Sequence, residues 1–123
     1  MRIDIVTLFP EMFRGPFDAS IVARAAEQGI VAIELHDLRA WGEGRHKIVD
    51  DYPHGGGAGM VLKPAPLFGA VEAIQPLAPE PGRVVLLTPQ GRPLTQAVVD
   101  ELAALPRLIL LCGHYEGVDE RVR

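Results

Sequence analysis

The sequence predicts an α/β fold with a mostly parallel sheet and helices on both faces. Segments of strand-like pattern alternate with segments of helical pattern, in the order β-α-β-loop-α-β-α-β. The two later strand-like segments, residues 83–87 (RVVLL) and 108–112 (LILLC), are almost continuously apolar. Such runs are typical of parallel strands that are buried on both faces, and right-handed crossovers then connect them.

The first half of the chain contributes two strands and a helix. Residues 2–9 (RIDIVTLF) are rich in β-branched side chains and stop at a proline, after which residues 11–13 fit a short helical turn. Ser20 is a candidate N-cap for a helix with one apolar face that ends at Gly29. Residues 30–38 (IVAIELHDL) alternate between apolar and polar side chains and predict the second strand.

Residues 39–63 show no steady periodicity, and order returns after them. Apolar residues at i, i+4 and i+7 predict a helix that begins at Pro66, and a Glu-Pro-Gly turn at 80–82 then leads into the RVVLL strand. Thr95 is the expected cap of another amphipathic helix, closed by Pro106. The LILLC strand follows this helix.

Composition excludes several classes of protein. The chain has 123 residues, 48% of them hydrophobic, and a formal net charge of −4, which fits one small folded domain and not a disordered chain. Its single cysteine, Cys112, excludes a disulfide scaffold and makes a reducing cytoplasm the expected compartment. No apolar run approaches the roughly 18 residues of a membrane span. The mild acidity argues against a protein that holds nucleic acid over its whole surface, but it allows a local basic patch.

The irregular middle segment carries the first concentration of chemistry. Residues 45–60 (RHKIVDDYPHGGGAGM) place four glycines within five positions, next to basic residues and two aspartates. Glycines let a ligand approach the backbone and supply N–H groups for anions, although no phosphate-binding loop motif is present. Long loops of this kind in compact domains are usually functional, so we expect a binding loop.

Two further polar segments directly follow the apolar strands. Residues 87–94 (LTPQGRPL) form a rigid Pro- and Gly-containing turn after one strand, and residues 112–121 (CGHYEGVDER) follow the other. Parallel sheets bind ligands outside the carboxyl ends of their strands. We therefore expect both segments to line one crevice that takes a small polar ligand with a planar group.

The other candidate chemistries are weaker. His46 and Asp50 have the i, i+4 spacing of a shared helix face, but no ligand set has a recognised zinc pattern, so no metal site is predicted. Cys112 is expected to be a small core residue and not a nucleophile. Two alternatives stay open: a non-catalytic RNA- or nucleotide-binding α/β module, and a metal-dependent phosphohydrolase that uses Asp50 and Asp51.

Four motifs, in their order and spacing, resemble those of the bacterial tRNA (guanine-N1)-methyltransferases, the TrmD family of the SPOUT superfamily. The matching stretches are IVTLFPEMF, RHKIVDDYPHGGGAGM, LTPQGRPL and LLCGHYEGVDERV, and the resemblance covers the whole chain. The sequence departs from the usual pattern at His54, where Tyr is common, and at His114, where Arg is common.

This resemblance implies a SPOUT-type fold with a trefoil knot, truncated here, in an obligate homodimer. It implies methyl transfer from S-adenosylmethionine to N1 of the guanosine at position 37 of certain tRNAs, next to the anticodon. The partners would be tRNA and a second subunit, with no membrane, and a divalent ion is possible. Carried over by position, the cofactor-binding residues are Leu87, Thr88, Pro89, Gln90, Gly113, Tyr115 and Glu116. The residues toward the substrate tRNA are Arg45, His46, Asp50, Gly55, Gly56, Gly57, Gly59 and Met60, with Lys47 as a further phosphate contact.

No catalytic residue is assigned within the chain. The resemblance implies that residues 1–123 are the amino-terminal part of the methyltransferase domain, and that the general base and its partner arginine lie beyond Arg123. The carboxyl-terminal tRNA-binding domain is likewise expected to be absent, so residues 1–123 alone are expected to be inactive. Asp119 and Glu120 are expected to be structural or to face the cofactor.

Overall fold

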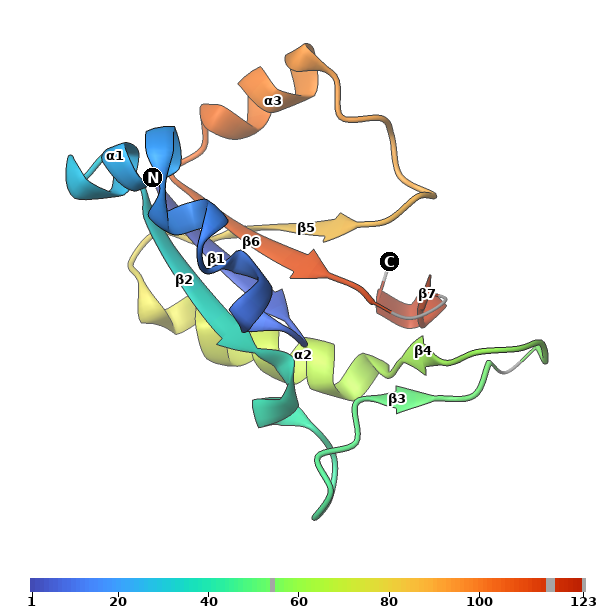
Figure 1. Ribbon diagram of the computed structural model, residues 1–123. Helices are drawn as coiled ribbons and strands as arrows, with labels where there is room; N and C mark the ends of the chain where they lie inside the picture. Colours follow the sequence, from blue (N-terminus) through green and yellow to red (C-terminus); the bar gives the residue numbers. More distant parts are fainter. Residues whose placement is uncertain (54, 115–116, 123) are drawn as a thin grey trace.

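A four-stranded parallel sheet forms the centre of the computed structural model, which describes residues 1–53, 55–114 and 117–122. Its strands run in the order β2-β1-β6-β5, and every neighbouring pair is parallel (Figure 1). The strands are β1 (Arg2–Thr7), β2 (Ala32–Asp37), β5 (Arg83–Leu87) and β6 (Arg107–Cys112). The predicted α/β class and the mostly parallel sheet are confirmed.

Helices cover both faces of this sheet, as predicted. Helix α2 (Pro64–Ile74) lies on one side, and α1 (Ser20–Glu27) and α3 (Gln96–Ala103) lie toward the other (Figure 1). Thr95 caps α3, since its hydroxyl accepts from the N–H of Val98 at 3.4 Å. Short 3-10 turns connect the elements, at Pro10–Phe13, Pro16–Asp18, Leu38–Trp41, Gln75–Leu77 and Glu120–Val122.

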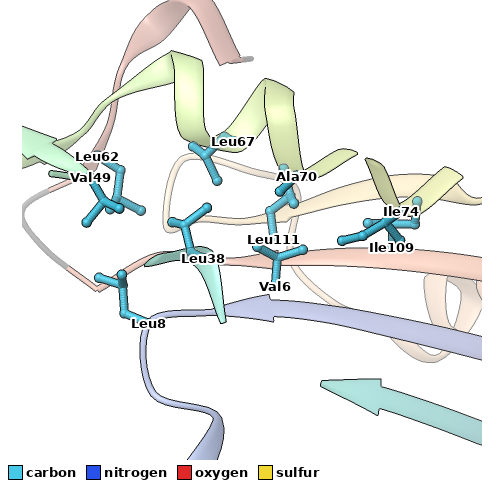
Figure 2. Packing of buried hydrophobic residues seen from close by; sticks show 10 residues of the cluster. All are labelled: Val6, Leu8, Leu38, Val49, Leu62, Leu67, Ala70, Ile74, Ile109 and Leu111. Carbon is cyan, nitrogen blue, oxygen red and sulfur yellow. The ribbon is translucent and has the colours of Figure 1, made fainter. Parts of the chain in front are cut away.

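The hydrophobic core lies between the sheet and α2. Alternate residues of β1 and β6 point toward Leu67, Ala70 and Ile74 on one face of the helix (Figure 2). Burial of each such aliphatic side chain contributes about 1.5–3 kcal/mol. The buried cluster is Val6, Leu8, Leu38, Val49, Leu62, Leu67, Ala70, Ile74, Ile109 and Leu111.

A second, small sheet was not predicted. It contains β3 (Asp50–Asp51), β4 (Val61–Leu62) and β7 (Gly117–Val118) in the order β3-β4-β7. Strands β3 and β4 are antiparallel, and β4 and β7 are parallel. Strands of two residues are too short to produce a periodic pattern. Their pairing brings the glycine-rich loop next to the segment that follows β6.

Three local predictions need correction. The cap position of α1 falls on Ala19, and Ser20 has no side-chain cap bond. Helix α2 begins at Pro64 and not at Pro66, because prolines are tolerated throughout the first helical turn. His46 and Asp50 share no helix face, since residues 43–48 form a turn and β3 follows it.

Strand β5 is an edge strand, so the prediction that RVVLL is buried on both faces is wrong. Val84 is 40% exposed and Leu87 is 51% exposed. In the part of the chain that the structure describes, β5 pairs only with β6, and no residue of α3 is buried. A run of apolar residues shows that a strand is hydrophobic, but it does not show how many strands pair with it in the sheet.

A buried network of charges joins three strands to the end of α2. The Asp4 carboxylate is fully buried, and it accepts hydrogen bonds from Arg2, from His36 Nε2 at 2.8 Å and from Arg107 Nε at 3.0 Å. The Arg107 guanidinium, 1% exposed, also donates to the carbonyl oxygens of Ile74 (2.6 Å) and Gln75 (2.7 Å). Burial raises the pKa of Asp4, but these hydrogen bonds outweigh it and hold the pKa below its ordinary value.

Candidate functional site

A cleft of about 710 Å³ opens at the carboxyl edge of the parallel sheet. Three segments that are distant in sequence enclose it: the turn after β5, the segment from β7 onward, and the β3–β4 hairpin. Its lining residues are Pro53, Gly55, Val61, Leu86, Thr88, Pro89, Gln90, Gly117, Val118, Asp119, Glu120 and Arg121. This is the edge at which the sequence predicts a ligand crevice.

The first wall is a tight turn built on Thr88. The carbonyl oxygen of Thr88 accepts from the N–H of Gly91 at 3.2 Å, so Pro89 and Gln90 are the central residues of a β-turn. The Thr88 hydroxyl also accepts from the N–H of Gln90 at 3.3 Å. Proline fixes the backbone at the second position of this turn, so the wall is rigid.

The second wall runs from β7 into a 3-10 turn that Asp119 holds in place. The N–H of Asp119 donates to the carbonyl of Leu62 at 3.1 Å, which continues the pairing of β7 with β4. Its carboxylate accepts from the N–H of Arg121 at 2.9 Å and from the guanidinium at 2.9 and 2.8 Å. This hydrogen bonding raises the pKa of Arg121. These hydrogen bonds hold the 3-10 turn that forms this wall of the cleft.

The third wall is the hairpin that carries the glycines. Pro53 and Gly55 reach the cleft from the hairpin tip, and Val61 reaches it from β4. No neighbouring atom lies within 4 Å of the position that a Cβ of Gly55, Gly56 or Gly57 would occupy. Gly56, Gly57 and Gly59 have φ values of +84°, +104° and +87°, a conformation that side-chain-bearing residues rarely adopt.

The lining of the cleft combines apolar and charged side chains. Val61, Leu86 and Val118 supply apolar surface for a planar ring, and Asp119 and Glu120 supply carboxylates. The volume lies within the roughly 300–1,000 Å³ that is typical of small-molecule sites. With Arg121 also in the lining, the cleft offers apolar surface for a planar group and charged side chains for a polar one.

The structure brings together part of the predicted cofactor set. Thr88, Pro89 and Gln90 line the cleft, whereas Leu87 and Gly113 are absent from its lining. Gly113 instead lies beside Val118, which does line it. Tyr115 and Glu116 lie outside the described residues, as does His54. His114 makes an edge-to-face ring contact with Phe9, with centroids 4.7 Å apart.

Of the residues expected to face tRNA, Gly55 alone appears in the lining of this cleft. The other predicted members lie along the hairpin and the turn that precedes it, outside the cleft. Asp50 is half-buried, and Arg45 and His46 are exposed on a turn at the opposite end of β3 from the glycines. The remaining members of that set are Gly56, Gly57, Gly59 and Met60.

Asp50 and Asp51 are consecutive residues of β3, so their side chains point to opposite faces and do not converge on one ion. Among the described residues, no group of three His, Cys, Asp or Glu side chains is placed to hold a metal. A search of the same residues for a helix long and apolar enough to cross a membrane finds none.

Several residues that shape the cleft were not singled out from the sequence. Val61 lies outside the predicted segments and reaches the cleft because β4 pairs with β7, and Leu86 precedes the predicted turn by one residue. Gly117 belongs to segment 112–121, which was expected to line the crevice. Asp119 was expected to be structural or to face the cofactor, and its carboxylate accepts from the backbone N–H two residues later, as in an Asx-turn.

The parallel sheet and the cleft at its carboxyl edge define a ligand-binding α/β protein. The family model described as tRNA (Guanine-1)-methyltransferase TrmD matches residues 1–123, and the chain belongs to this family. The chain is 57% identical over its full length to the tRNA (guanine-N(1)-)-methyltransferase of Chloroflexus aurantiacus, of which it covers 49%. It is also 57% identical to the protein of that name from Dehalococcoides mccartyi, of which it covers 50%.

The fold agrees with that of a solved relative. The crystal structure of tRNA (m1G37) methyltransferase from Aquifex aeolicus matches 99% of this chain at a TM-score of 0.89 and 37% identity, and 55% of that chain is covered. The chain thus spans about half the length of the relatives that it matches.

Proposed function

We propose that the full-length protein transfers a methyl group from S-adenosylmethionine to N1 of guanosine 37 in certain tRNAs. The observation that carries the proposal is the family match over the whole chain, together with a cleft at the carboxyl edge of the sheet. We place the protein in the cytoplasm as a homodimer, with residues 1–123 forming the amino-terminal part of its methyltransferase domain.

S-adenosylmethionine supplies an electrophilic methyl group when it is bound. The residues of this chain would position it: the Thr88–Gln90 turn on one side, Asp119 and Glu120 near its positive charge, and Leu86 and Val118 against the adenine. Gly113, Leu87, Tyr115 and Glu116 are proposed as further contacts. The hairpin with Gly55 closes the cleft from the direction in which the target base would enter.

The reaction also needs a base. Guanine N1 carries a proton in the neutral ring, so methyl transfer requires its removal and stabilisation of the charge that develops on the carbonyl oxygen. Following the resemblance to the family, we propose that the base and the residue that stabilises the carbonyl lie in the part of the longer relatives that residues 1–123 do not cover.

Transfer of a labelled methyl group tests the proposal. The full-length protein is incubated with labelled S-adenosylmethionine and tRNA transcripts that carry G or A at position 37. Label is expected in the G37 transcript alone, at N1 of that guanosine. Absence of cofactor binding in calorimetry, with RNA binding intact, would instead support the non-catalytic RNA-binding module.

A further inference from the structure

We propose that Phe9 is a positioning residue for cofactor binding, because its ring holds His114 and so fixes the place at which the chain leaves β6 toward the cleft. This inference rests on the proposed function, since it concerns how the cofactor site described above is built. Phe9 itself does not line the cleft. It acts through the segment that follows β6, and that segment does reach the cleft.

The contact joins the ends of two neighbouring strands. β1 and β6 are parallel and lie side by side, and Val6 pairs with Leu111 in the last pair of their register (Figure 1). Three residues further along each strand come Phe9 and His114, so the two rings continue this register beyond the sheet. Their centroids are 4.7 Å apart and their planes are inclined at 68°, which is the edge-to-face arrangement that aromatic rings favour.

The backbone of Phe9 is held on both sides. Its N–H donates to the hydroxyl of Thr7 at 3.1 Å, and its carbonyl accepts from the N–H of Met12 at 3.0 Å. Pro10 begins a 3-10 turn directly after it, and a proline restricts the backbone of the residue that precedes it. Leu8, the preceding residue, is buried in the core. The ring of Phe9 thus projects from a fixed backbone, which suits it to hold a neighbouring side chain in place.

The segment that follows β6 is attached to the cleft as well. A Cβ on Gly113 would lie 3.6 Å from Cγ2 of Val118, which lines the cleft. The N–H of Asp119 donates to the carbonyl of Leu62 at 3.1 Å, and this fixes the far end of the segment on β4. The ring contact lies at the near end, where the chain leaves β6. Both ends of the segment are therefore held.

The proposed cofactor contacts of this segment surround the ring contact in sequence. Gly113 directly precedes His114, and Tyr115 and Glu116 follow it. Without the ring contact, the place where the chain leaves β6 is no longer fixed beside the cleft. Contacts that are preorganised bind more tightly than contacts that must be ordered on binding, because ordering costs conformational entropy. Loss of the ring contact should therefore weaken cofactor binding without removing a group that touches the cofactor.

A second aromatic pair provides the matched control. Phe13 and Phe17 also pack edge to face, with centroids 5.4 Å apart and planes inclined at 72°. Both residues lie between β1 and α1, and neither lines the cleft. If Phe9 only stabilised the fold, Phe9→Leu and Phe13→Leu should have the same effect on cofactor affinity. A positioning role predicts that only Phe9→Leu changes it.

The test uses the full-length protein and measures S-adenosylmethionine affinity by calorimetry, together with kcat and KM for methyl transfer to tRNA. Phe9→Leu should bind the cofactor about 3- to 10-fold more weakly, because an edge-to-face pair contributes roughly this factor to an equilibrium. The KM for S-adenosylmethionine should rise by the same factor, whereas kcat and the KM for tRNA should stay within about twofold of the wild type. Phe9→Tyr keeps the ring and should retain wild-type cofactor affinity.

A double-mutant cycle shows whether Phe9 acts through His114. In the His114→Ala background the partner ring is already gone, so Phe9→Leu should weaken cofactor binding by less than about twofold further. The full effect of Phe9→Leu in that background would show independent action and would overturn the inference.

A variant of the backbone contact replaces Phe9→Leu if that protein does not fold. Thr7→Val removes the hydroxyl that accepts from the N–H of Phe9 and leaves both rings in place. It should weaken cofactor binding by about 2- to 4-fold, the lower part of the range for one hydrogen bond. Thr7→Ser keeps the hydroxyl and should bind the cofactor as the wild type does. Equal affinity in the two Thr7 variants would count against the inference.

The outcomes separate this inference from the proposed function. Absence of cofactor binding in the wild-type protein would refute the proposed function. Wild-type cofactor affinity in Phe9→Leu, or equal weakening in Phe13→Leu, would overturn the inference and leave methyl transfer standing. A raised KM for tRNA with an unchanged KM for S-adenosylmethionine would also overturn it, because Phe9 would then act on the RNA.

Discussion

Replacement of Asp4 by Asn should be among the most destabilising single substitutions in the chain. Asn keeps the shape of Asp4 and removes its charge, so the Arg107 guanidinium, 1% exposed, loses its buried counter-ion. Removing one partner of a buried ion pair costs about 3–5 kcal/mol. We expect about 3 kcal/mol, because Arg107 retains its carbonyl acceptors and Arg2, 27% exposed, turns toward solvent.

Urea unfolding, followed by fluorescence of the single tryptophan, Trp41, measures this loss at pH 7. The effect should also depend on pH. The folded-state pKa of Asp4 is below its ordinary 3.8, so its contribution is present above that value and is lost as pH falls through the folded pKa. The difference in free energy of unfolding between the wild type and Asp4→Asn should therefore close below about pH 3.8.

Glu11→Gln, which removes the exposed ion pair with Arg14, is the control and should lower the free energy of unfolding by less than about 0.5 kcal/mol. A loss under about 1 kcal/mol for Asp4→Asn, or a gap of constant size at pH 3, would refute the reasoning.

Other substitutions and reagents test separate parts of the fold. Gly82→Ala should lower the free energy of unfolding in urea by about 1–3 kcal/mol, because the new Cβ would lie 2.6 Å from Cγ1 of Ile109. An unchanged free energy of unfolding would contradict this packing. Thr95→Ala should lower the free energy of unfolding by about 1 kcal/mol, because α3 loses its N-terminal cap. Thr95→Ser keeps a hydroxyl and should retain most of this stability. Equal stability of the two variants would argue against the cap. Burial raises the pKa of the Cys112 thiol. Its reaction with an aromatic disulfide at pH 8 should therefore be at least about tenfold slower than in the urea-unfolded chain, and it should accelerate above pH 9. Equal rates in the folded and unfolded states would contradict the burial of the thiol.

The sequence allowed the parallel sheet to be predicted because its strands are long enough to show a pattern. β1, β2 and β6 each contain six residues, and their β-branched and aliphatic side chains stand out between proline and glycine. The crevice could be predicted because parallel sheets bind ligands at the carboxyl ends of their strands, and the Thr88–Gln90 turn does line the cleft found there. The pairing of β4 with β7 was beyond prediction, because two-residue strands carry no period and their register is set by tertiary contacts.

Two further features show where local pattern fails. The exposed Val84 and Leu87 have the side chains of a central strand, and only the sheet order shows that β5 is at the edge. In the sequence Gly42 looks like any other loop glycine, but a Cβ at this position would clash with the backbone of Lys47, five residues later. Both features depend on which segments lie close together in the fold, and a single sequence does not contain that information.

Calorimetric titration of the full-length protein with S-adenosylmethionine, comparing the wild type with Gly117→Leu, tests the central claim most directly. A Cβ on Gly117 meets nothing within 4 Å, so a leucine there should fold and fill the cleft. The matched control is Ala103→Leu, which adds the same side chain to an exposed position of α3. We predict binding in the wild type and in Ala103→Leu, and affinity at least about 30-fold weaker in Gly117→Leu, about 2 kcal/mol. Equal affinity in all three proteins would contradict the assignment of this cleft as the cofactor site.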